Sequence, residues 1–82
     1  RDACLAGIAG HAATIAAIIG AAKARHAPKA TWSAESLALH TQAVIQGAFI
    51  LAKAKNDLEL ARDSILHLRR YVELLFHHAK ED

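Results

Sequence analysis

The sequence predicts an all-α fold of three helices, and three observations support this fold class. Twenty of the 82 residues are Ala, which has the highest intrinsic helix propensity. Val and Thr, which favour strands, are scarce. Apolar residues recur with helical spacing on either side of two short breaks, one around Pro28 and one at Asn56 and Asp57. We therefore expect one domain over 1–82, with helices at about 2–26, 33–55 and 57–79.

The first predicted helix ends ahead of Pro28, which cannot continue a helix and moves Ala27 out of the α region. Large apolar residues and small residues occupy opposite sides of this helix, and we expect the small side to admit another backbone closely. The large side comprises Cys4, Leu5, Ile8, Ile15, Ile18 and Ile19, and the small side comprises Ala6, Ala9, Gly10, Ala13, Ala16, Ala17 and Gly20.

The segment Ala3–Ala22 carries no formal charge over 20 residues, a length that matches a membrane span. Only five of these residues are large aliphatics, whose insertion free energy sums to about −2.5 kcal/mol. His11, Thr14 and three Gly residues oppose insertion. We therefore expect a helix buried within protein and no membrane partner.

The second predicted helix has a well-defined start. Ser33 is placed to be the N-cap, because its hydroxyl can accept a hydrogen bond from an unpaired backbone N–H of the first turn. Trp32 and Leu37 have the spacing of a hydrophobic staple, and Glu35 lies at the favourable end of the helix dipole.

The surface of the second helix is apolar or small around most of its circumference. A surface helix needs an apolar stripe only somewhat wider than 100°. We therefore expect this helix to pack on two sides, one of them against a partner. Its narrow polar stripe comprises Glu35, Gln42, Gln46 and Lys53.

The third predicted helix is more amphipathic. Asn56 is the expected N-cap, with Glu59 as its capping-box partner. Arg69 and Glu73 have the i, i+4 spacing of a surface ion pair. Two large apolar residues interrupt the charged side, which predicts a contact outside the protomer. With the residue between them they form the row Leu66, Arg70 and Leu74.

Residue types for catalysis are scarce. No Gly-rich phosphate loop and no nucleophile elbow is present, so we expect neither an enzyme nor a cofactor. Cys4 is the single cysteine, which excludes an internal disulfide and favours a reducing, cytoplasmic setting. His77, His78 and Glu81 do not have the spacing of a dedicated metal site, so we expect no metal. The formal charge of +2 and the lack of a helix-turn-helix pattern argue against direct DNA binding.

Two segments resemble the C-terminal region of TetR/AcrR-type transcriptional regulators. The first is the run HTQAVIQGAFILAKAKND over 40–57, a Gln- and Ala-rich helix that ends in a short polar joint. The second is ILHLRRY over 65–71 followed by LLF over 74–76, a leucine-rich final helix. The match covers about 33–76 and is weaker over 1–30.

The resemblance implies an effector-sensing and dimerisation domain. In that family the last two helices form an antiparallel hairpin that pairs with a second subunit as a four-helix bundle, and a small-molecule effector bound in the helical core controls operator DNA binding by an N-terminal helix-turn-helix domain. That DNA-binding domain is not present in these 82 residues, and we expect the chain to be part of a longer regulator.

The helix surfaces and the resemblance together predict residues for two sites. We expect the homodimer interface to contain Leu39, Ala43, Gln46, Gly47, Ile50, Leu66, Arg70 and Leu74. Candidate contacts to the unidentified effector are His11, Thr14, Ile18 and His40, because a His in an apolar helix needs a polar partner if it is buried. Two alternatives stay open, namely a stand-alone helical adaptor without a ligand and a membrane-associated helical protein.

Overall fold

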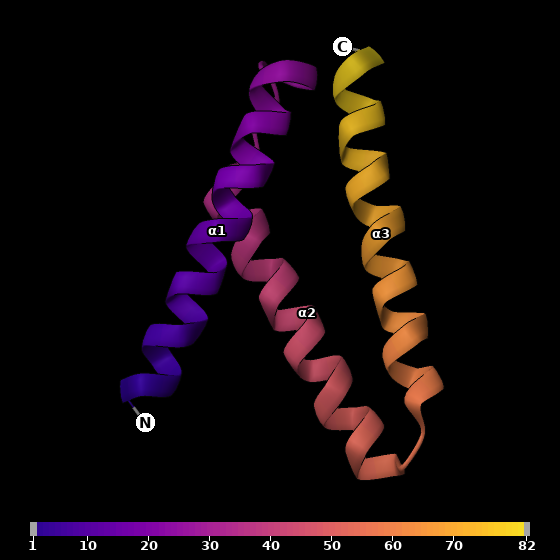
Figure 1. Ribbon diagram of the computed structural model, residues 1–82. Helices are drawn as coiled ribbons and strands as arrows, with labels where there is room; N and C mark the ends of the chain where they lie inside the picture. The colour runs from indigo at the N-terminus through magenta and orange to yellow at the C-terminus, as the bar shows by residue number, and fades with distance from the viewer. Residues whose placement is uncertain (1, 82) are drawn as a thin grey trace. The chain divides into compact units, whose positions relative to one another are not determined.

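The computed structural model of the chain is built from three α-helices, and no strand occurs among residues 2–81, whose backbone the structure describes (Figure 1). Side chains are described for 11–78. The helices are α1 (Asp2–His26), α2 (Ala34–Lys55) and α3 (Leu58–Glu81). The chain divides into two compact units, 1–42 and 43–82, and α2 passes from the first into the second. The predicted all-α class and the three helices are confirmed.

The start of α2 confirms the predicted cap. The backbone N–H of Ser36 donates a hydrogen bond to Ser33 Oγ at 3.0 Å, and the N–H of Leu37 donates to the Ser33 carbonyl at 3.1 Å. The Ser33 hydroxyl therefore satisfies one of the N–H donors that the first turn leaves unpaired, and the Ser33 carbonyl accepts the first helical hydrogen bond. Trp32 is half-buried beneath Lys23, whose Nζ lies 5.7 Å from the centre of the indole ring.

The joint between α2 and α3 corrects one prediction, because Asn56 is not the cap of α3. Asn56 ends α2 in the left-handed conformation, with a φ of 52°. Its N–H donates to the Lys53 carbonyl at 3.2 Å, and the N–H of Asp57 donates to the Ala52 carbonyl at 2.8 Å, which is a Schellman motif. Asp57 is the cap, since its Oδ1 accepts the N–H of Glu59 at 3.0 Å. Asn tolerates the left-handed region, so the carboxylate one residue later takes the capping role.

The first unit is held by small side chains of α1 and the start of α2. Ala12, Ala27, Ala34, Leu37 and Ala38 are buried. A Cβ built on Gly20 would meet the Cβ of Ala34 at 3.8 Å, so the two helices approach closely there. Part of the predicted small side is thus used for packing, whereas Ala13 and Ala17 are exposed. The residues of this helix before position 11, including Cys4, lie outside the described side chains.

The second unit is a helical hairpin. The chain reverses at Asn56 and Asp57, between the end of α2 and the start of α3 (Figure 1). Within the hairpin, α3 contacts α2 extensively. The core of the hairpin consists of Ala48, Ala52 and Ala61, with Leu60 packed against them. Apolar residues gather on one side of α3, as predicted, and are spread around α2. The predicted ion pair is present, with Arg69 Nε 3.7 Å from Glu73 Oε2.

Among the described residues, no helix combines the length and the apolar character that a membrane span requires. In the uncharged segment Ala3–Ala22, which was considered above as a membrane span, residues 3–10 lie outside the described side chains.

Candidate interaction surface

Many large apolar side chains of the described residues are exposed, while most of the buried residues are alanines. The exceptions are Leu37 and Gln42, so the predicted polar stripe of α2 is buried at Gln42. Apart from Leu37, the buried apolar residues at 11–78 are alanines. Burial of a Leu or Ile side chain is worth about 1.5–3 kcal/mol, so these exposed groups are a large unused source of stabilisation. The exposed residues are Ile18, Leu39, Phe49, Ile50, Leu51, Leu58, Ile65, Leu66, Tyr71 and Leu74.

The predicted interface residues of α2 form one exposed row. Leu39 and Ile50 are 59% and 66% exposed, and Ala43 and Gln46 are exposed beside them. At 100° per residue, Ile50 lies about 160° around the helix from the buried Ala48 and Ala52. We call Leu39, Ala43, Gln46, Gly47 and Ile50 the α2 row.

Gly47 leaves open space at the middle of the α2 row. Apart from its chain neighbours and the backbone of its own helical turn, no described atom lies within 4 Å of a Cβ built on this residue, so no tertiary contact of the described residues requires a glycine there. A helix interior disfavours Gly relative to Ala by about 0.5–1 kcal/mol. An approaching backbone would use this space, which is the arrangement that small residues permit between closely packed helices.

The predicted residues of α3 form a second exposed row, which we call the α3 row: Leu66, Arg70 and Leu74. Arg70 lies about 180° around the helix from the buried Ala61. A shallow hollow of about 510 Å³ lies on this side of α3, toward the C-terminus from Leu66. Its lining residues are Arg70, Glu73, Leu74 and His77.

The two rows face away from the core of the hairpin. Ala48, Ala52 and Ala61 form the one cluster between the two helices. Around α2, the part of the α2 row within the second unit lies on the other side of the helix from Ala48 and Ala52. Around α3, the α3 row lies on the other side of the helix from Ala61. The two rows therefore lie on outer sides of the hairpin as separate surfaces. The sequence predicted both rows but not their separation, since helical periodicity gives faces on one helix and not the relation between two helices.

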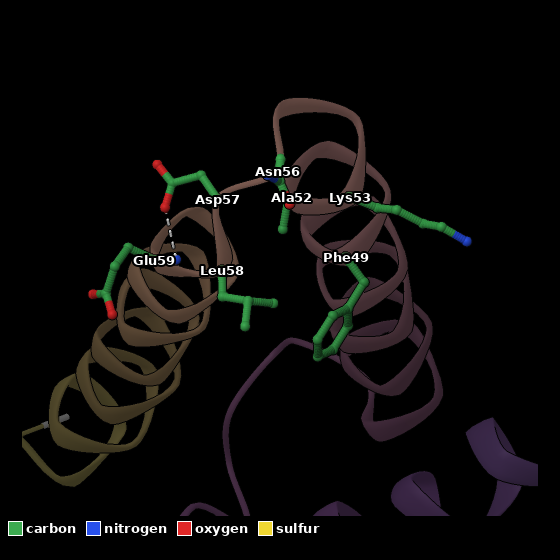
Figure 2. A pocket seen from close by; sticks show the side chains of 7 residues that line it. All are labelled: Phe49, Ala52, Lys53, Asn56, Asp57, Leu58 and Glu59. Atoms are coloured by element: carbon green, nitrogen blue, oxygen red, sulfur yellow. Dashed lines mark hydrogen bonds between the residues drawn. The ribbon is translucent and has the colours of Figure 1, made fainter.

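The turn of the hairpin forms a pocket that the sequence did not predict. Its volume is about 670 Å³. Figure 2 shows Leu58 extending from the start of α3 toward α2, with Phe49 on the facing helix. These two side chains are 77% and 52% exposed. The remaining lining residues are Ala52, Lys53, Asn56, Asp57 and Glu59. The available signal was a large apolar residue, Leu58, directly after the polar joint, with Phe49 about two helical turns before the joint.

The joint between α1 and α2 forms a smaller hollow of about 450 Å³ in the first unit. Lys23, Ser33 and Glu35 supply its polar groups. The basic Lys23 and the acidic Glu35 share this hollow, so it offers no single charge to a ligand. Its other lining residues are Gly20, Ala24, Pro28 and Ala34.

The candidate effector contacts lie at exposed positions. His11, Thr14 and Ile18 follow one side of α1, and His40 is exposed on α2. None of the four lines the three pockets described above. The structure therefore brings three of them onto one side of α1. Among the described residues, no group of three or more His, Cys, Asp or Glu side chains is placed to hold a metal ion.

Comparison of the chain with protein-family profiles, with curated proteins and with solved structures finds no match.

Proposed function

We propose that the chain is a helical self-association domain that pairs with a second copy through the α2 row. The observation that carries this proposal is the inverted distribution of apolar groups, with an alanine interior and Leu39 and Ile50 on the surface. A closed two-fold contact is the commonest way in which soluble proteins bury such a surface.

The order of large and small residues along α2 suits the pairing of this helix with a second copy of itself. In an antiparallel pairing with the two-fold axis between Gln46 and Gly47, Ala43 faces the partner's Ile50. In the same register Leu39 faces the partner's Ala54, so each large side chain meets a small one. Gly47 at the centre permits close approach of the two backbones, because the space beside it is open.

In its full form, the proposal is a ligand-sensing and dimerisation domain of a TetR-like transcriptional regulator in the cytoplasm. Binding of a small molecule would be coupled to release of operator DNA through a DNA-binding domain outside these 82 residues. This part rests on the resemblance of 40–57 and 65–76 to that family. The exposed side of α1 that carries His11, Thr14 and Ile18 is the proposed effector-facing surface, together with His40.

The association is tested by sedimentation velocity over a range of protein concentrations. We expect a reversible assembly at micromolar concentration, and we expect Gly47→Leu to weaken it about ten-fold or more, because the added side chain fills the space of approach. The matched control is Ala21→Leu, which adds the same side chain type at an exposed position of α1. A folded monomer at all concentrations contradicts the proposal.

The regulator assignment has a separate test. The reading frame that encodes the full protein should contain a helix-turn-helix segment ahead of Arg1. A full reading frame without such a segment favours the stand-alone adaptor and leaves the self-association itself standing.

A further inference from the structure

We draw no further inference here: the strongest candidate, the pocket at the turn of the hairpin between Phe49 and Leu58, is an exposed apolar surface, and nothing in the structure shows what covers it.

Discussion

The backbone N–H of Asp57 donates a hydrogen bond to the carbonyl oxygen of Ala52 over 2.8 Å, and this bond closes the C-terminal end of α2. The same residue starts α3, since Asp57 Oδ1 accepts the N–H of Glu59. One residue therefore ends one helix and caps the next. This double role makes the joint short and brings Ala52 next to Ala61 in the hairpin core.

Asn56 supplies the left-handed backbone conformation that the joint needs. Replacement by Ala and replacement by Gly should therefore have different effects on the free energy of unfolding. Asn56 has a φ of 52°, and Asn56→Ala should lower the free energy of unfolding by about 1 kcal/mol, because Ala lacks the short polar side chain that lets Asn tolerate the left-handed region. Asn56→Gly should be neutral or slightly stabilising. Urea unfolding measures both, and Lys55→Ala is the control at an ordinary helical position. Equal effects of Ala and Gly would contradict this conformation.

Asp57 is expected to matter through its carboxylate. Asp57→Ala should lower the free energy of unfolding by about 1 kcal/mol, since the N–H of Glu59 loses its acceptor. Asp57→Ser should retain most of the stability, because Ser is also a good N-cap. Thermal unfolding followed by circular dichroism measures the difference, which corresponds to about 4–8 °C in Tm for a domain of this size. If Ala and Ser variants unfold alike, the cap does not stabilise α3.

The alanine core limits the size of the side chains between α2 and α3. Ala48→Leu should destabilise the hairpin by about 1–3 kcal/mol, because Ala48 is 4% exposed and packs with Ala52 and Ala61. The matched control is Ala21→Leu, which adds the same atoms at an exposed position of α1 outside the hairpin. Chemical unfolding at one protein concentration compares the two variants. A neutral Ala48→Leu would show that the helices are not in close contact there.

The contact between Lys23 and Trp32 predicts a spectroscopic change. Lys23→Gln should shift the fluorescence of Trp32, the single tryptophan, and lower the free energy of unfolding by about 0.5–1 kcal/mol. Lys23→Arg should keep the contact, because a guanidinium also stacks on an indole. Lys29→Gln, at an exposed lysine, is the control and should leave the emission unchanged.

Gly47 allows stability to be separated from association. At concentrations below assembly, Gly47→Ala should raise the free energy of unfolding by about 0.5–1 kcal/mol, because the added Cβ meets no atom within 4 Å. Gly20→Ala is the comparison, since its Cβ makes an ordinary contact with Ala34 at 3.8 Å and should stabilise similarly. A loss of stability in Gly47→Ala at low concentration would show that the α2 row is covered within one chain.

Local sequence signals predicted the helices well. The cap at Ser33 and the pair between Arg69 and Glu73 depend on residues three or four positions apart, so helical geometry alone places them. The cap of α3 was assigned one residue early, because Asn56 and Asp57 are both good N-caps in sequence. Only the left-handed backbone at Asn56 distinguishes the two roles.

The candidate surfaces were predicted in part. Periodicity placed the α2 row and the α3 row on exposed helix sides, because the polar and apolar stripes are visible along each helix. The pocket between Phe49 and Leu58 was not predicted, since these residues belong to different helices and meet only after the chain reverses.

The sequence by itself determined the class of the fold, the number of helices and the side of each helix that carries apolar groups, because these follow from propensities and spacings within a few residues. The tertiary structure decided which apolar groups are buried. It placed Ala48, Ala52 and Ala61 between the helices of the hairpin and left Leu39, Ile50 and Leu74 exposed. The physical reason is that small side chains allow the closest approach of two helix backbones, so several of the larger ones remain exposed.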